Sequence, residues 1–123
     1  MNLGALVAPA IGLAITGCAG TSDVSKANAH ELVQAGARLV DVRTVDEYED
    51  KHPPEAINIP LDELKKRFAD IGPTSTSVVV YCHTGVRAAI ATGWLRKAGY
   101  KVYNLGAMDR WYTETKGQPS KFD

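Results

Sequence analysis

The sequence lacks the residues of a structural metal site and of a disulfide framework. It contains two cysteines, Cys18 at the end of an apolar stretch and Cys82 at the end of a strand-like run. No CxxC pair occurs, and the three histidines (His30, His52 and His83) are scattered along the chain. Because zinc sites need clustered ligands at short spacings, we expect no metal and no cofactor. The positions of the two cysteines do not indicate a disulfide either.

An excess of charge of either sign is also absent. Lysine and arginine together number 14, and so do aspartate and glutamate, in a chain of 123 residues. A balanced chain creates no overall field that would attract nucleic acid or an acidic membrane surface, so we expect no nucleic-acid partner. Internal repeats and low-complexity runs are absent too, and the length fits one domain.

Charged side chains are missing from residues 1–20, which are almost entirely small and apolar. The apolar stretch from Leu3 to Ile15 is short for a bilayer span and contains a proline, so it fits the core of a signal peptide better than a transmembrane helix. The run Ile15-Thr16-Gly17-Cys18 looks like a bacterial lipobox, in which Cys18 would receive lipid after cleavage. We therefore expect a bacterial protein that is exported to the periplasm and attached to a membrane only through this leader or its lipid. An ordinary secretory leader, an uncleaved anchor and a buried segment of the domain are the alternatives.

From Ser22 onward, strand-like and helix-like patterns alternate, which is typical of an α/β domain with a mainly parallel sheet and helices on both of its faces. The continuous β-branched and aromatic run Val78–Tyr81 predicts a central strand that is buried on both sides. We expect this domain to span residues 22–114 and a polar tail to span 115–123. Strands are expected at 39–42, 56–59, 78–81 and 100–105, and helices at 29–35, 44–49, 61–68, 86–98 and 107–113.

The helix after the central strand has an apolar stripe that we expect to face the core. Its members recur at helical spacing: Val86, Ile90, Ala91, Trp94, Leu95 and Ala98.

The most informative feature is a thiol at the end of a strand, followed at once by the start of a helix. Cys82 closes the buried run, and Arg87 follows in the first turn of the helix. Open α/β sheets bind ligands beyond the carboxyl ends of their strands. Gly85 permits a positive φ, so the loop amides can point inward as an anion-binding nest. Together with the helix dipole they would stabilise the thiolate, which is the nucleophilic form of cysteine.

The segment Cys82-His83-Thr84-Gly85-Val86-Arg87 resembles the six-residue active loop Cys-x-x-Gly-x-Arg of the rhodanese family. The resemblance covers nearly all of the chain from Val24 to Trp111. Three other segments resemble further signatures of the family, in the right order: Asp41-Val42-Arg43-Thr44 with Glu47-Tyr48, then Ala56-Ile57-Asn58-Ile59-Pro60, and then Gly106-Ala107-Met108-Asp109-Arg110-Trp111.

This resemblance implies a rhodanese-like sheet of about five strands and a sulfurtransferase activity. Cys82 would take a sulfane sulfur from a small donor such as thiosulfate or a persulfide. It would hold that sulfur as a persulfide and pass it to cyanide, a small thiol or a thiol protein. The substrate-binding residues would be His83, Thr84, Gly85, Val86 and Arg87, with Arg87 orienting an anionic donor or steadying the loop. The supporting residues would be Asp41, Arg43 and Glu47.

The segment Lys51–Ala56 departs from the family, because two of the family's glycines are replaced there. No family role is therefore carried over to His52.

Two other classes of function remain open. A phosphatase or arsenate reductase also combines a cysteine, a cradle of amides and an arginine, but such phosphatases place five residues between cysteine and arginine, whereas this chain has four. A non-catalytic binding module or a periplasmic redox-thiol protein is the third class. For three single residues there is an alternative interpretation without a functional role. Cys82 would be an inert buried residue, Arg87 a solvated surface charge, and His83 a loop residue with no special role.

Overall fold

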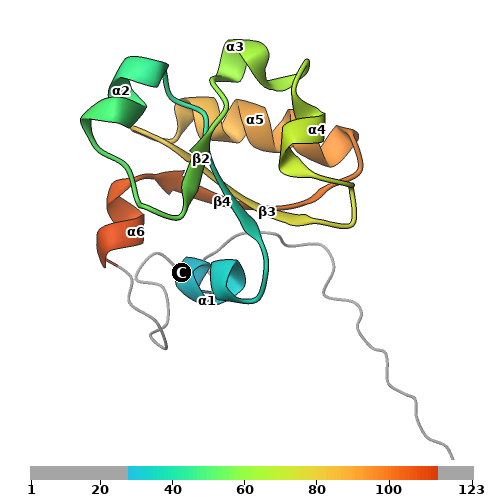
Figure 1. The fold of residues 1–123 in the computed structure, drawn as a ribbon, viewed down its shortest axis with the longest axis horizontal. Coiled ribbons are helices and arrows are strands. Elements are labelled where there is room, and N and C mark those ends of the chain that lie inside the picture. Colours follow the sequence, from blue (N-terminus) through green and yellow to red (C-terminus); the bar gives the residue numbers. More distant parts are fainter. Residues whose placement is uncertain (1–27, 114–123) are drawn as a thin grey trace, which may run out of the picture.

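The computed structural model describes residues 28–113 (Figure 1). The expected leader with Cys18, the start of the domain before residue 28 and the expected tail lie outside the described residues. Over the described part, no helix is both long enough and apolar enough to cross a membrane.

Four strands form one parallel sheet in the described residues, in the order β2-β1-β3-β4, where about five strands were expected. In the register of the sheet, Asp41 lies beside both Asn58 and Tyr81. Because all four strands run in the same direction, their carboxyl ends share one edge, and Asp41, Asn58 and Cys82 all lie there. The strands are β1 (Arg38–Asp41), β2 (Ala56–Asn58), β3 (Ser77–Cys82) and β4 (Lys101–Ala107).

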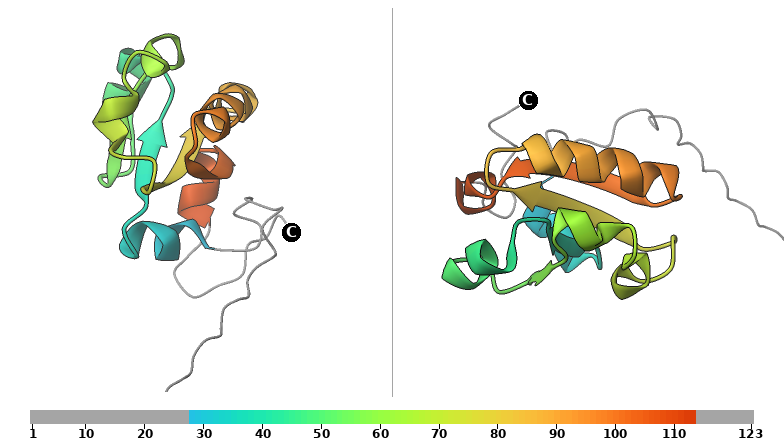
Figure 2. Two further views of the ribbon diagram at one scale, coloured as in Figure 1. Left: turned by 90° about the vertical axis from the view of Figure 1, so that its right-hand side faces the viewer. Right: turned by 90° about the horizontal axis from the view of Figure 1, so that it is seen from above.

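Helices cover both faces of the sheet, as expected (Figure 2). In Figure 1, α3, α4 and α5 lie above the sheet, α1 and α6 lie below it, and α2 lies near the carboxyl ends of the strands. The helices are α1 (Ala29–Gln34), α2 (Val45–Asp50), α3 (Leu61–Leu64), α4 (Phe68–Ile71), α5 (Val86–Lys97) and α6 (Asp109–Thr113).

Alternation along the strands divides the core into two apolar clusters. Val40, Val80 and Cys82 face the cluster beneath α5, whereas Leu39 and Tyr81 face the cluster covered by α1 and α6. β3 is buried from Val78 to Cys82, which confirms the expectation that it is a central strand. The cysteine is therefore built into the most enclosed element of the sheet.

The helix expected over residues 61–68 is two short helices instead. Arg67 leaves the helical conformation, with φ −124° and ψ 25°, and separates α3 from α4. Its guanidinium donates to Glu63 in α3 and to Asp70 in α4. The apolar spacing of Leu61, Leu64 and Phe68 is compatible with either arrangement, so the break was not visible in the pattern.

The expected buried stripe of α5 is wrong at two positions. Val86 is 67% exposed and Ile90 is 42% exposed. The buried residues of α5 are Ala88, Ala91, Thr92 and Leu95. Small and apolar residues occur all around this helix, so the sequence pattern fits more than one buried face, and the small alanines are the ones that pack on the sheet.

Candidate active site

The sulfur of Cys82 accepts hydrogen bonds from two backbone amides. The N–H of Gly85 donates to Sγ at 2.9 Å, and the N–H of Ala88 donates to Sγ at 3.3 Å. Gly85 has φ +109°, and this left-handed turn aims its amide back at the strand end. Ala88 belongs to the first turn of α5, where amides are not used by the helix and the helix dipole is positive. The sulfur therefore lies in a nest of amides that favours a negative charge on it.

The side chain of Cys82 is completely buried. His83, Thr84 and Val86 are exposed at the outside of the loop, and Gly85 is half-buried. The N–H of Met108, after β4, donates to the Cys82 carbonyl at 2.8 Å and holds the strand end from the opposite side. In this conformation the sulfur is therefore not exposed to solvent.

Arg87 is bound by Glu47 in this structure. Its two terminal nitrogens donate to the two carboxylate oxygens of Glu47 at 2.8 and 3.1 Å. The hydrogen bonds from Arg87, and then the backbone N–H of Thr44, lower the pKa of Glu47 to about 2. In this geometry the anionic partner of Arg87 is the carboxylate of Glu47, and both roles expected for Arg87 stay predictions.

Glu47 is itself held in place by the start of α2. Thr44 is the N-cap residue, and its side chain accepts from the N–H of Glu47 while the Glu47 side chain accepts from the N–H of Thr44. This capping box fixes the direction of the Glu47 carboxylate. The ion pair between Arg87 and Glu47 therefore connects the active loop to α2, whose start is fixed by the capping box.

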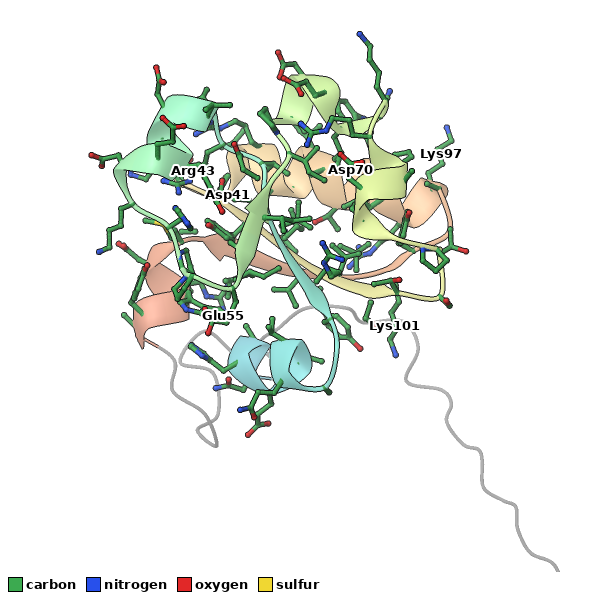
Figure 3. All side chains as sticks on the ribbon, viewed as in Figure 1. Asp41, Arg43, Glu55, Asp70, Lys97 and Lys101 are labelled. Carbon is green, nitrogen blue, oxygen red and sulfur yellow. The ribbon has the colours of Figure 1, made fainter. Side chains whose placement is uncertain are left out.

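Asp41 and Arg43 form a buried pair at the end of β1 (Figure 3). Arg43 Nη2 lies 2.6 Å from Asp41 Oδ2, and the backbone N–H of Arg43 donates to Asp41 Oδ1 at 2.8 Å. Arg43 also donates to the carbonyl of Lys51 at 2.7 Å, which holds the segment that departs from the family pattern. The pair makes no direct hydrogen bond to Cys82 and supports the edge of the sheet.

Two residues that no site prediction included complete this support. The hydroxyl of Tyr81 donates to Asp41, and burial together with that hydrogen bond raises the pKa of Tyr81 far above its usual range, so the hydroxyl keeps its proton. The side-chain amide of Asn58 donates to the carbonyls of Asp41 and Arg43, each at 3.0 Å. The sequence offered one signal for each of these two residues. Tyr81 immediately precedes Cys82, and Asn58 lies in a segment that resembles a family signature.

His52 does not join this site. Its ring stacks on Tyr48 with centroids 3.6 Å apart, and its Nδ1 is hydrogen-bonded to the Tyr48 carbonyl at 2.7 Å. Among residues 28–113, no group of three or more His, Cys, Asp or Glu side chains is arranged to hold a metal ion.

Arg87 and Glu47 each line one of two pockets. The first has a volume of about 370 Å³ and is mostly apolar; it is lined by Val42, Thr44, Pro60, Leu61, Asp62, Arg87 and Trp94. The second has a volume of about 400 Å³ and is lined mainly by charged and polar residues: Arg43, Glu47, Asp50, Lys51, His83, Met108 and Asp109.

Comparison with known proteins identifies this arrangement. Residues 25–114 match the rhodanese-like domain family. The chain belongs to the rhodanese family. Its α/β fold and its parallel sheet are those of the solved rhodanese structures described below.

Relatives of this rhodanese include both small proteins and parts of larger ones. It is 38% identical over 100 residues to the protein YqhL of Bacillus subtilis, covering 77% of this chain and 79% of that protein. It is 38% identical over 78 residues to the thiosulfate sulfurtransferase PspE of Escherichia coli, covering 62% of this chain and 75% of that protein. A probable molybdopterin-synthase adenylyltransferase of Porphyra purpurea is 33% identical over 75 residues, covering 59% of this chain, but the chain spans 20% of its length.

Solved structures show the same fold. A rhodanese from Escherichia coli with bound anions has a TM-score of 0.56 and 36% identity, with 59% of this chain and 88% of that chain covered. A human single-domain sulfurtransferase has a TM-score of 0.59 and 26% identity, with 75% of this chain and 98% of that chain covered.

Proposed function

We propose that this rhodanese is a sulfurtransferase that carries a sulfane sulfur as a persulfide on Cys82. The observation that carries the proposal is the pair of amides, from Gly85 and Ala88, that donate to Sγ. Both amides are placed to donate to the sulfur before the reaction and to a persulfide anion after it. The relatives named as thiosulfate sulfurtransferase and as single-domain sulfurtransferase support the same activity.

In the first half of the proposed reaction, the Cys82 thiolate attacks the outer sulfur of thiosulfate. The sulfur–sulfur bond of thiosulfate breaks, sulfite leaves with the electron pair, and a persulfide anion remains on the enzyme. In the second half, cyanide or a thiolate attacks the terminal sulfur. Thiocyanate or a new persulfide leaves, and the Cys82 thiolate is restored without any outside oxidant or reductant.

Phosphoryl transfer fits the geometry less well. The nest donates to a single sulfur atom, and the arginine that would bind a phosphoryl group is engaged by Glu47. A phosphatase also needs donors around three equatorial oxygens.

Mass spectrometry after incubation with thiosulfate tests the proposal. A gain of about 32 Da, the mass of one sulfur atom, is expected on the proteolytic peptide that contains Cys82, because the thiolate is the nucleophile. Cyanide should remove the added mass and release thiocyanate, and Cys82→Ser should show neither event. Protein that gains no sulfur from thiosulfate, organic thiosulfonates or small persulfides would contradict the proposal, and so would an adduct confined to another residue.

A further inference from the structure

An exposed apolar ridge begins inside the active loop and runs along α5. Val86, Ile90 and Trp94 are spaced four residues apart, so their side chains line up on one side of the helix, and we call these three residues the apolar ridge. Val86 and Ile90 are two of the four large hydrophobic residues that are exposed in the described part of the chain. Trp94 is half-buried and packs partly against the core.

The fold does not require Val86 and Ile90 to be apolar. The contacts of α5 with the sheet come from Ala88, Ala91 and Leu95, which are completely buried. Polar residues would be expected on the opposite side of a surface helix. Contiguous exposed apolar side chains typically mark a surface that binds another molecule.

A groove made of two pockets lies between α5 and the α3–α4 segment, and Trp94 of the ridge borders it. At the loop end it is the apolar pocket that Leu61, Arg87 and Trp94 help to line. At the other end, a pocket of about 410 Å³ is lined by Lys65, Phe68, Trp94, Lys97 and Ala98. Trp94 borders both pockets, so the two adjoin at its ring, and we refer to them together as the groove.

The far end of this groove is basic. The ammonium group of Lys65 lies 4.3 Å from the centroid of the Trp94 ring. Lys97 lies at the end of α5 that is remote from Asp41 and Arg43 (Figure 3). Within residues 28–113 neither lysine forms an ion pair, and the nearby carboxylates Glu63 and Asp70 are both bound by Arg67. Asp62, the acidic residue that lines the groove, lies at the loop end.

We propose that this groove binds an extended segment of a protein that accepts sulfur from Cys82, with its thiol at the loop end and acidic residues at the lysine end. Aliphatic side chains of the segment pack on the apolar ridge, and its carboxylates face Lys65 and Lys97. The inference rests on the proposed function and specifies its acceptor. The acceptor thiolate attacks the terminal sulfur of the Cys82 persulfide, the sulfur–sulfur bond breaks, and the Cys82 thiolate leaves.

The dimensions of the ridge define the probe. The eight steps along the helix from Val86 to Trp94 correspond to a rise of about 12 Å along its axis. An extended chain spans that distance in about four residues. A suitable acceptor is therefore a synthetic peptide of about eight residues with a cysteine at one end, leucine in the middle and glutamates at the other end. Its partner peptide carries lysines in place of the glutamates.

The experiment measures kcat/KM for transfer of sulfur from the thiosulfate-loaded protein to each peptide. We expect the acidic peptide to react about fivefold to tenfold faster than the basic one at low salt, and the difference to shrink as salt screens the charges. The double variant Lys65→Glu/Lys97→Glu should reverse the preference. Lys66→Glu/Lys101→Glu makes the same change in net charge at exposed positions outside the groove and should keep the preference of the wild type.

The apolar part of the inference has its own variant. Ile90→Asn should lower transfer to the acidic peptide by about threefold to tenfold, through lost apolar contact, and leave discharge by cyanide unchanged. Equal rates for the two peptides would overturn the inference, as would a lysine-to-glutamate double variant that behaves like its control. If Ile90→Asn instead separates a dimer of this chain, the ridge is an interface between copies and the inference is wrong. Failure of the proposed function is distinguishable, because then no persulfide forms on Cys82 at all.

Discussion

The chemistry at Cys82 depends on backbone conformation more than on any neighbouring side chain. Both donors to Sγ are amides, and one of them is aimed by the positive φ of Gly85. An amide donor is not removed by substituting its own side chain. It is lost when the chain adopts a different conformation, so the residue that controls the nest is the glycine.

Gly85→Ala should damage both stability and sulfur transfer. A Cβ at Gly85 would lie no closer than 3.8 Å to other atoms, but a φ of +109° is strained for any L residue. We expect the free energy of unfolding to fall by about 1–3 kcal/mol. Persulfide formation should slow by about tenfold to a hundredfold, because the amide is no longer aimed at the sulfur. Urea unfolding measures the first effect. Mass spectrometry of samples quenched at successive times after the addition of thiosulfate measures the second.

Gly36→Ala is the matched control for this substitution. Gly36 has φ +114° with open space around the position of a Cβ, and it lies before β1 at the opposite edge of the sheet. The Gly36→Ala variant should lose a similar amount of stability. Its rate of persulfide formation, corrected for the fraction of folded protein, should equal that of the wild type. Equal losses of rate in both variants would show that strain alone, and not the aimed amide, accounts for the effect.

Single residues of the site were predictable where chemistry and spacing agree. A cysteine at a strand end, a glycine in the turn and an arginine in the next helical turn identify the loop without coordinates. The complete burial of Cys82 was not predictable, because it depends on how α5 and the end of β4 close over the strand. Neither was the part played by Tyr81, since an aromatic residue in a buried strand usually serves only as core.

At the scale of elements, one ion pair joins α2 to α5. Glu47 is presented by the capping box of α2, and Arg87 is presented by the first turn of α5. Both side chains are about one third exposed, with values of 31% and 33%. Such a pair contributes up to about 1 kcal/mol, so its importance lies in positioning rather than in overall stability.

Glu47→Gln should reveal this pair through the dependence of stability on pH. The folded pKa of Glu47 is about 2, below the ordinary value of 4.5, so its ionised form is favoured by folding. That contribution is complete above pH 4.5 and is lost as the pH falls toward about 2. The wild type should therefore exceed the variant in free energy of unfolding at neutral pH, and the difference should narrow across that acid range. Urea unfolding at a series of pH values measures it.

Glu49→Gln controls for the simple loss of a carboxylate from α2. Glu49 is exposed and forms no ion pair among the described residues. Its variant should differ little from the wild type, and any difference should not follow the acid range of Glu47. A constant gap for Glu47→Gln down to pH 2 would contradict the assigned pair.

Elements were predictable where local rules act alone. Thr44 with Glu47 indicates a helix start from sequence, and the structure has a capping box there. The division of the 61–71 segment into α3 and α4 was not predictable from the sequence, because Arg67 can either continue a helix or pair with carboxylates on both sides of a break. The buried face of α5 was not predictable either, because packing against the sheet selects the small residues of this helix over its large ones.

At the scale of the whole molecule, the parallel sheet gathers distant segments at one edge. β1, β2 and β3 deliver Asp41, Asn58 and Cys82 to that edge from parts of the chain up to 41 positions apart. The order of strand-like and helix-like segments was enough to predict this class of fold. The sequence pattern does not state which buried groups hold the strand ends together, because those contacts join residues of high sequence separation.

The last prediction concerns Asp41, which accepts hydrogen bonds from Arg43 and from Tyr81 while it is completely buried. Asp41→Asn leaves the buried Arg43 cation without its counter-charge, and breaking a buried pair in this way costs about 3–5 kcal/mol. A domain of this size has a total stability of only about 5–15 kcal/mol, so the variant should be close to unfolding at physiological temperature.

Arg67→Gln removes an arginine from exposed ion pairs and should change the free energy of unfolding by less than about 1 kcal/mol. In the double variant Asp41→Asn/Arg43→Met the stranded charge is gone, so the loss should be smaller than the sum of the two single losses. Thermal and urea unfolding of the wild type and of four variants measure this coupling. The variants are Asp41→Asn, Arg43→Met, the double variant of the two, and Arg67→Gln. Strictly additive losses would mean that Asp41 and Arg43 stabilise the edge of the sheet independently, and that their charge pair is not what holds the end of the first strand.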